Sequence, residues 1–90
     1  MEEKKAYVYI LHCSDHSLYT GWTFDPIQRL RRHQEGRGAK YTKTRRPVSL
    51  VYLEQLPDRS SAMKRECALK KLSRAQKLML IAQQNSIELI

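Results

Sequence analysis

Two short apolar segments near the start of the chain have the composition of β-strands. Residues 6–13 are rich in β-branched and aromatic side chains, and they are too short and too apolar for a surface helix. Residues 18–23 have a similar composition. Asp15-His16-Ser17, which lies between the two segments, favours a turn. We therefore expect a β-hairpin in this part of the chain.

Three later segments carry helix start signals, in each case an aspartate or serine before the first turn. Asp25 is followed by Pro26, which suits the first position of a helix, and Gly36 is expected to end that helix. We expect the three helices over about 26–35, 59–71 and 74–82.

The segment between the first two helices combines a polar stretch with a third strand. Residues 36–46 contain five basic side chains and no apolar period, which predicts a loop or a short turn of helix. Pro47 precedes a third predicted strand over 48–54. The order is ββαβαα, which indicates an α+β fold with a small three-stranded antiparallel sheet flanked by helices. We expect one domain over residues 1–90, with a core from about 6 to 82 and a C-terminal tail over 83–90.

Composition narrows the class of protein. Hydrophobic residues make up 41% of the 90 residues, enough for one compact core but not for a large enclosed cavity, so any site is expected to be shallow. No apolar run approaches the roughly 20 residues of a membrane span, and the first residues do not form a secretory signal. Cys13 and Cys67 are too few for a disulfide framework, and with His12 and His16 they lack the spacing of a zinc site. We expect a cytoplasmic protein without a membrane partner.

Positive charge is concentrated in one segment. The chain has 17 Lys and Arg against 9 Asp and Glu, a formal net charge of +8. Residues 28–46 contribute most of this excess, with eight basic side chains and only Glu35 as an acid. Such a segment favours a polyanionic partner, of which nucleic acid is the commonest. A solvated basic surface without a specific partner is the alternative.

Two groups of polar side chains are candidates for chemistry. Tyr7 and Tyr9 lie two residues apart on a predicted strand and share a face of the sheet, and Tyr19 lies on the partner strand. Arg29 and His33 share a face of the first predicted helix, where a guanidinium can bind phosphate and an imidazole can transfer a proton. Simpler explanations exist for both groups. The tyrosines can reflect the general preference of strands for tyrosine, and Arg29 and His33 can be ordinary solvent-facing residues.

Glu66 is a third candidate because it falls on the apolar side of its predicted helix, close to Leu69. A carboxylate in such a position is costly unless it is paired or binds a metal ion. Three partners are open: a metal ion, Lys70 in a surface ion pair one turn further on, or Arg29 in a buried structural link.

The spacing of these residues carries a family resemblance. Tyr9 and Tyr19 are ten residues apart, as are Tyr19 and Arg29; His33 follows four residues later, and Glu66 lies on the next long helix. The matching motifs are Tyr7-Val8-Tyr9, Tyr19-Thr20-Gly21, Gly38-Ala39-Lys40-Tyr41-Thr42 and Arg46-Pro47. Over about residues 6–72 the chain resembles the GIY-YIG nuclease family, and in particular a small stand-alone bacterial branch whose role is largely unassigned. Tyr7 departs from the pattern, since it stands where the family name has its first glycine.

The resemblance implies a nuclease with one divalent cation, Mg²⁺ or Mn²⁺, held by Glu66. In that reading Tyr9 helps to deprotonate the attacking water, and Tyr19 orients this network and the scissile phosphate. Arg29 stabilises charge that develops on the phosphate, and His33 assists proton transfer or phosphate positioning. Because tyrosine has an ordinary pKa near 10, we expect the cation and the arginine to lower the pKa of Tyr9.

Binding is expected through phosphates. We expect DNA, ahead of RNA, to contact seven side chains of the basic segment: Arg32, Arg37, Lys40, Tyr41, Lys43, Arg45 and Arg46. Relatives in this family that cut specific DNA sequences carry additional recognition domains, for which this chain has no room. The resemblance therefore implies little base readout and selectivity for DNA structure, with a role in repair or recombination. A catalytically weak nucleic-acid-binding module is the alternative. A small subunit that works with an unknown protein partner is a third possibility.

Overall fold

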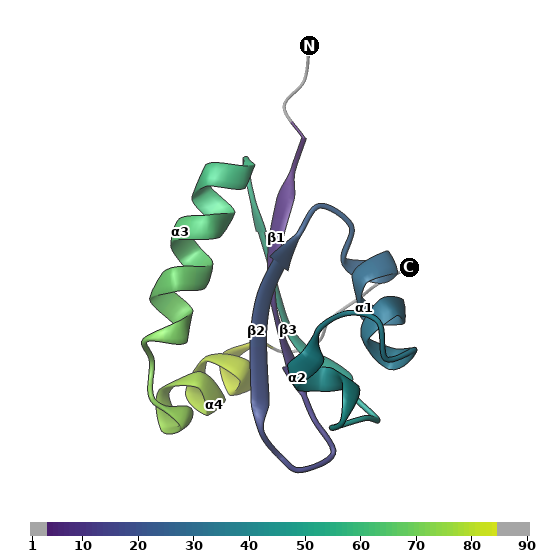
Figure 1. The fold of residues 1–90 in the computed structure, drawn as a ribbon. Coiled ribbons are helices and arrows are strands. Elements are labelled where there is room, and N and C mark those ends of the chain that lie inside the picture. Colours follow the sequence, from purple (N-terminus) through teal and green to yellow (C-terminus); the bar gives the residue numbers. More distant parts are fainter. Residues whose placement is uncertain (1–3, 85–90) are drawn as a thin grey trace.

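A computed structural model gives the structure of residues 4–84 (Figure 1). Three strands and four helices follow one another in this part of the chain: β1 Ala6–His12, β2 Leu18–Thr23, α1 Pro26–Gln34, α2 Lys40–Lys43, β3 Ser49–Leu56, α3 Arg59–Lys70 and α4 Arg74–Gln83. The predicted α+β class is confirmed, as is the order ββαβαα. α2 is the short turn of helix expected within the basic segment.

The sheet is antiparallel, and its strand order is β2-β1-β3. The predicted hairpin is formed by β1 and β2, and it places Tyr9 directly opposite Gly21. On the other side of β1, β3 pairs with Tyr9 through Leu53. The central strand therefore carries Tyr9 into the middle of the sheet, where both neighbouring strands fix the position of its backbone.

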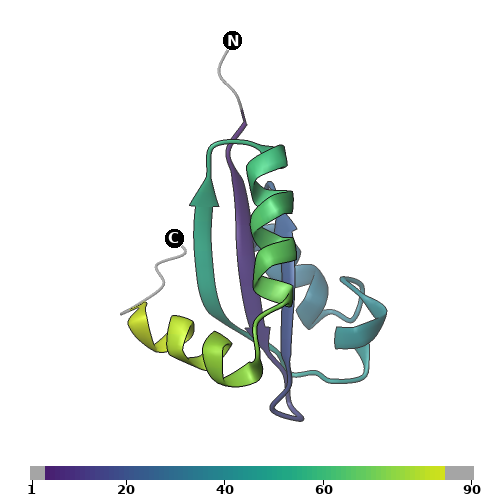
Figure 2. The ribbon, with the colours of Figure 1, turned by 90° about the vertical axis from the view of Figure 1, so that its left-hand side faces the viewer.

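Helices cover the two faces of this sheet differently (Figures 1 and 2). α3 lies on one face, and α1 and α2 lie on the other. Because successive strand residues point to opposite faces, Val8 and Ile10 pack in one cluster with Leu69 of α3, whereas Tyr9 and Leu11 belong to a second cluster. Full burial of each large aliphatic side chain contributes about 1.5–3 kcal/mol. The alternation of β1 thus directs Tyr9 toward α1 and α2.

The helix starts follow the predicted caps. The side chain of Asp25 accepts a hydrogen bond from the backbone N–H of Gln28, with an N–O distance of 3.0 Å, and Asp58 and Ser73 cap α3 and α4 in the same way. No helix within residues 4–84 has both the length and the apolar character needed to cross a membrane. α4 extends to Gln83, and residues 85–90 of the expected tail lie outside the described residues.

Candidate active site

Tyr9 occupies a place in the sheet that only a glycine neighbour permits. Its side chain is 2% exposed and lies against Gly21 of the adjacent strand. A Cβ atom on Gly21 would lie 2.6 Å from the phenol oxygen, well inside van der Waals contact. Gly21 therefore makes room for the Tyr9 hydroxyl on the face that α1 and α2 cover.

His33 meets that hydroxyl from α1. Its Nε2 lies 2.9 Å from the phenol oxygen of Tyr9, and its Nδ1 lies 2.8 Å from the Thr42 hydroxyl oxygen. The imidazole is 1% exposed, so the simpler explanation of a solvent-facing residue is wrong for His33. Gly38 packs so closely on the ring that a Cβ there would lie 2.4 Å from Nδ1. Both ring nitrogens of His33 are thus hydrogen-bonded, and the backbone of Gly38 packs closely against one side of the ring.

The phenol and the imidazole are electrostatically perturbed in ways that favour their neutral forms. Burial is the main cause that raises the pKa of Tyr9 to about 12, and the neighbouring Tyr19 raises it further. Arg29 lowers the pKa of Tyr9 and Glu66 raises it, so both charged groups act on the phenol. Burial, followed by the charge of Arg29, lowers the pKa of His33.

These shifts correct one expectation and show which candidate residues influence the Tyr9 phenol. The expected lowering of the Tyr9 pKa is wrong for the protein's own groups, because burial outweighs the effect of Arg29. Tyr9 and His33 are in direct contact, and Arg29 and Glu66 lie within electrostatic range of Tyr9. The two charged residues come from α1 and α3, on opposite faces of the sheet.

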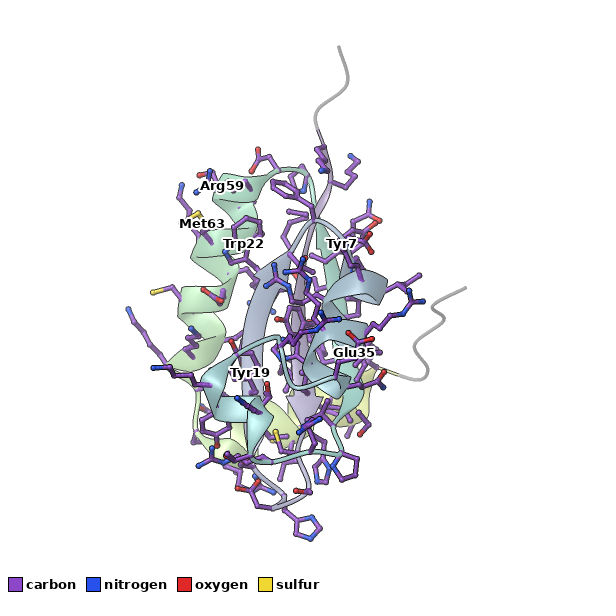
Figure 3. The ribbon with its side chains drawn as sticks, turned by 45° about the vertical axis from the view of Figure 1, so that its right-hand side comes forward. Tyr7, Tyr19, Trp22, Glu35, Arg59 and Met63 are labelled. Carbon is purple, nitrogen blue, oxygen red and sulfur yellow. The ribbon has the colours of Figure 1, made fainter. Side chains whose placement is uncertain are left out.

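Tyr19, which Figure 3 labels, lies at the centre of an aromatic cluster. Its ring centroid is 5.2 Å from that of His33, 6.4 Å from that of Tyr9 and 5.8 Å from that of Tyr41. Tyr41 stacks on Tyr19, and the Arg45 guanidinium carbon lies 3.9 Å from the Tyr41 ring centroid. β2 and α2 are thereby joined through aromatic side chains beside the Tyr9–His33 contact.

Glu66 remains available to a cation. Its side chain is 22% exposed, and its carboxylate lies 3.7 Å from Lys70 Nζ, a loose pair of the kind expected one helical turn apart. Within residues 4–84, the ion pairs of Glu66 do not include Arg29, so the proposed buried link is not formed there. No group of three or more His, Cys, Asp or Glu in this range could enclose a metal ion. One carboxylate nevertheless fits a hydrated Mg²⁺ or Mn²⁺, since Mg²⁺ keeps several of its waters when it binds.

The predicted nucleic-acid-binding residues divide into two groups. Lys40, Tyr41 and Lys43 are exposed on α2, next to the aromatic cluster. Arg32 and Arg37 instead line an open pocket of about 420 Å³ with Gln28, Arg31 and Glu35. Arg37 is also paired with Glu35 there. The predicted phosphate contacts thus come from α1, from the loop that follows it and from α2.

Arg45 and Arg46 have structural partners of their own. Arg45 donates from Nε to a carboxylate oxygen of Asp15 at 2.9 Å and from Nη1 to the carbonyl oxygen of Tyr41 at 2.8 Å. Arg46 donates from Nε to the carbonyl oxygen of Lys43 at 3.0 Å. Arg45 therefore fastens the basic segment to the β1–β2 turn, a role that its charge alone did not indicate.

Sequence reasoning missed Thr42 and Gly38 as parts of this site. Both lie in the polar segment, where Thr42 is buried and Gly38 contacts His33. The motif Gly38-Ala39-Lys40-Tyr41-Thr42 contains both residues, but Lys40 and the basic side chains around the motif indicate phosphate binding instead. A buried threonine in a charged segment is recognisable only once the segment is folded against α1.

Comparison with known proteins identifies the family. The GIY-YIG catalytic domain matches residues 5–79 of this chain. A UPF0213 protein from Syntrophus aciditrophicus is 59% identical over 80 residues, which cover 88% of this chain and 92% of that protein. A UPF0213 protein from Staphylococcus haemolyticus is 56% identical over 77 residues, which cover 86% and 94%.

A solved structure agrees with the sequence comparison. The solution NMR structure of a UPF0213 protein from Bacillus halodurans has a TM-score of 0.60 and 43% sequence identity, and the match covers 91% of this chain and 87% of that one. The chain belongs to the GIY-YIG family, a nuclease family, and is similar to its small single-domain UPF0213 members. The resemblance inferred from the two tyrosine motifs is confirmed.

Proposed function

We propose that the protein is a divalent-metal-dependent endonuclease that hydrolyses phosphodiester bonds in DNA. The observation that carries the proposal is the buried hydrogen bond between Tyr9 and His33, beside Tyr19 and within range of Arg29 and Glu66. A phosphodiester displacement needs a deprotonated nucleophile and groups that stabilise the charge of the phosphate. These five side chains are of the types that supply both.

The proton path follows from the two perturbed pKa values. With a pKa of about 12, free tyrosinate would be present in only about one molecule in 10⁵ at pH 7. Tyr9 therefore acts in a concerted step, in which its oxygen takes a proton from the attacking water while its own proton passes to His33 Nε2. His33 is neutral at pH 7, because burial lowers its pKa, and can accept that proton. The step leaves hydroxide at the phosphorus and an imidazolium at His33.

The remaining side chains act on the phosphate. Arg29 stabilises negative charge on the non-bridging oxygens with a planar guanidinium, and Tyr19 orients the phosphate and the Tyr9 hydroxyl. Glu66 is the residue that would hold one Mg²⁺ or Mn²⁺ ion, and such an ion supplies charge neutralisation at the phosphate and the leaving oxygen.

The proposed substrate follows from how cations are distributed. Lys40 and Lys43 are exposed on α2 near the aromatic cluster, where they would contact phosphates of the bound strand. Phosphate contacts position DNA without reading its sequence. We therefore assign selectivity to DNA structure, such as flaps, forks and junctions, and a role in DNA repair or recombination inside the cell.

The test is a cleavage panel of flap, fork, junction and single-stranded DNA, with single-stranded RNA, in Mg²⁺ or Mn²⁺. Wild type is expected to cut at least one DNA, and Glu66→Gln to lose cleavage while it binds the same DNA within about twofold in EDTA. Lys70→Gln is the matched control, because it removes the ion-pair partner of Glu66 and leaves the carboxylate. Cleavage by Glu66→Gln at the wild-type rate would refute the proposed metal ligand.

A nucleic-acid-binding module without useful catalysis is the second candidate. It is favoured by one observation, that Tyr9 is 2% exposed and has its pKa raised to about 12. In that case neither wild type nor Glu66→Gln cuts any substrate of the panel, and both bind DNA alike. The panel therefore separates the two functions.

A further inference from the structure

Thr42 is the one residue of α2 that turns away from solvent. Its side chain is 0% exposed, whereas Lys40, Tyr41 and Lys43 of the same short helix are exposed. The hydroxyl oxygen lies 2.8 Å from His33 Nδ1 and 3.2 Å from the carbonyl oxygen of Ala39. The proton path proposed above uses His33 Nε2 and gives Thr42 no part.

The direction of each hydrogen bond follows from the donors available. A carbonyl oxygen only accepts, so Thr42 donates its single hydroxyl proton to Ala39. The Thr42 oxygen then accepts from His33, which places a proton on Nδ1. A neutral imidazole carries one proton, so its Nε2 has a free lone pair that accepts from the Tyr9 hydroxyl. One chain of donors thus runs from Tyr9 through His33 and Thr42 to Ala39.

We propose that Thr42 is a positioning residue that holds His33 in the Nδ1–H tautomer, so that Nε2 is free to receive the proton of Tyr9. This inference rests on the proposed nuclease function for its catalytic consequence. The opposite tautomer would place a proton on Nε2, and that nitrogen would then donate to the Tyr9 oxygen. His33 could not accept a proton there, and the proton of the attacking water would have no route away from Tyr9.

The surroundings of His33 fit this role. Tyr9 and Tyr19 face the ring from the sheet, Arg29 faces it from the preceding turn of α1, and Thr42 faces it from α2. After the transfer, the imidazolium carries protons on both nitrogens. It can donate to Thr42 and to the Tyr9 oxygen without a change of position. The hydrogen bond from His33 Nδ1 to the Thr42 oxygen is therefore kept before and after the proton transfer.

The position of Thr42 also links substrate binding to the proton path. Lys40 and Lys43, the proposed phosphate contacts, flank Thr42 on a helix of four residues. Arg45, two residues after this helix, donates to the Tyr41 carbonyl oxygen within the helix and to the Asp15 carboxylate in the β1–β2 turn. The basic segment thus supplies cations on its outer side and the tautomer-setting hydroxyl on its inner side.

The test reads the tautomer directly with ¹⁵N-labelled protein. In wild type we expect His33 Nδ1 to give a protonated-type chemical shift and Nε2 an unprotonated-type shift, at a pH where His33 is neutral. Thr42→Val keeps the shape but removes the acceptor, so the N–H facing it would be buried without a partner, which is costly. We expect the two shifts to exchange in Thr42→Val. Thr42→Ser retains the hydroxyl and is expected to keep the wild-type pattern.

The catalytic consequence is measured on the DNA that wild type cuts. We expect Thr42→Val to lower kcat about 10²-fold, the low end of what a general base contributes, with the Kd for DNA unchanged. Thr42→Ser is expected to recover most of the rate. Thermal melting of each variant separates these effects from a loss of folding.

Several results would overturn the inference. An unprotonated-type shift at Nδ1 of wild type does so by itself, even if Thr42→Val does not fold. An unchanged tautomer in folded Thr42→Val, or a full cleavage rate with an exchanged tautomer, does so as well. If the shifts exchange as expected but wild type cuts no substrate, the proposed nuclease function fails while the hold of Thr42 on the tautomer stands.

Discussion

The close contact between Gly38 and His33 predicts that Gly38→Ala lowers the free energy of unfolding. A Cβ on residue 38 would lie 2.4 Å from Nδ1, 2.5 Å from Cγ and 2.7 Å from Cε1 of the His33 ring. These are atoms of a buried ring whose two nitrogens are both hydrogen-bonded, not the end of a flexible chain. The ring cannot yield without giving up its bonds to Tyr9 or Thr42.

Two effects of Gly38→Ala oppose each other. Gly38 does not have a left-handed backbone conformation, so the loss of unfolded-state entropy alone would stabilise the protein by about 0.4–1 kcal/mol. Overpacking of a buried site costs about 1–3 kcal/mol, and each hydrogen bond lost by His33 costs about 0.5–1.5 kcal/mol more. The contact dominates, and we expect a net loss of about 1–3 kcal/mol in the free energy of unfolding. For a domain of this size each kcal/mol corresponds to a fall in Tm of about 4–8 °C.

The assay is urea unfolding of four proteins: wild type, Gly38→Ala, His33→Ala and the double variant. Without the ring, the added methyl group has room, so Gly38→Ala is expected to cost little in the His33→Ala background. The coupling free energy should then be about 1–3 kcal/mol. An equal loss in both backgrounds, or a Gly38→Ala protein as stable as wild type, would show that this close approach does not govern the site.

Further predictions concern protonation and charge. Burial lowers the pKa of His33 in the folded state, so the unfolded chain binds more protons than the folded protein near pH 6. The free energy of unfolding should therefore fall as the pH drops below about 6.5. Tm measured from pH 5 to 8 should vary less in His33→Gln than in wild type. If Lys43 and Arg46 each contact one phosphate, charge reversal should weaken DNA binding equally across sequences and reduce the salt slope by about 0.9 per lost contact, as anisotropy at several salt concentrations can measure. Arg45→Ala should instead lower the free energy of unfolding by about 1 kcal/mol, because it loses the ion pair with Asp15 and the contact with the Tyr41 ring. An equal Tm for Arg45→Ala and Arg46→Ala would contradict this structural role of Arg45.

Local chemistry made much of the fold predictable. The β-branched run of β1 and the caps at Asp25, Asp58 and Ser73 act over a few residues, so their effects can be recognised without the rest of the chain. The period of two along β1 likewise predicts that Tyr7 and Tyr9 share one face of the sheet, and Val8 lies in the other cluster. The three helix starts and the hairpin accordingly lie where they were expected.

The candidate site was predictable only in part. Spacing along the chain placed Arg29 and His33 on one face of α1, but it could not tell that His33 is covered and Arg29 only half-buried. Coverage of His33 depends on the packing of α2, whose Thr42 is nine residues away in sequence and which has no apolar pattern that would predict its burial. The same packing buries the phenol of Tyr9 and raises its pKa, although Arg29 acts to lower that pKa. A tyrosine in the sequence does not by itself indicate this burial.

The amino-acid sequence by itself thus determined the secondary structure, the faces on which the polar side chains lie and the family, because each depends on near neighbours or on motif spacing. Only the tertiary structure decided which hydroxyl and which backbone atoms meet the imidazole of His33. Those contacts join β1, α1 and the segment around α2, and they form only when the helices cover the sheet and exclude water from the space between them.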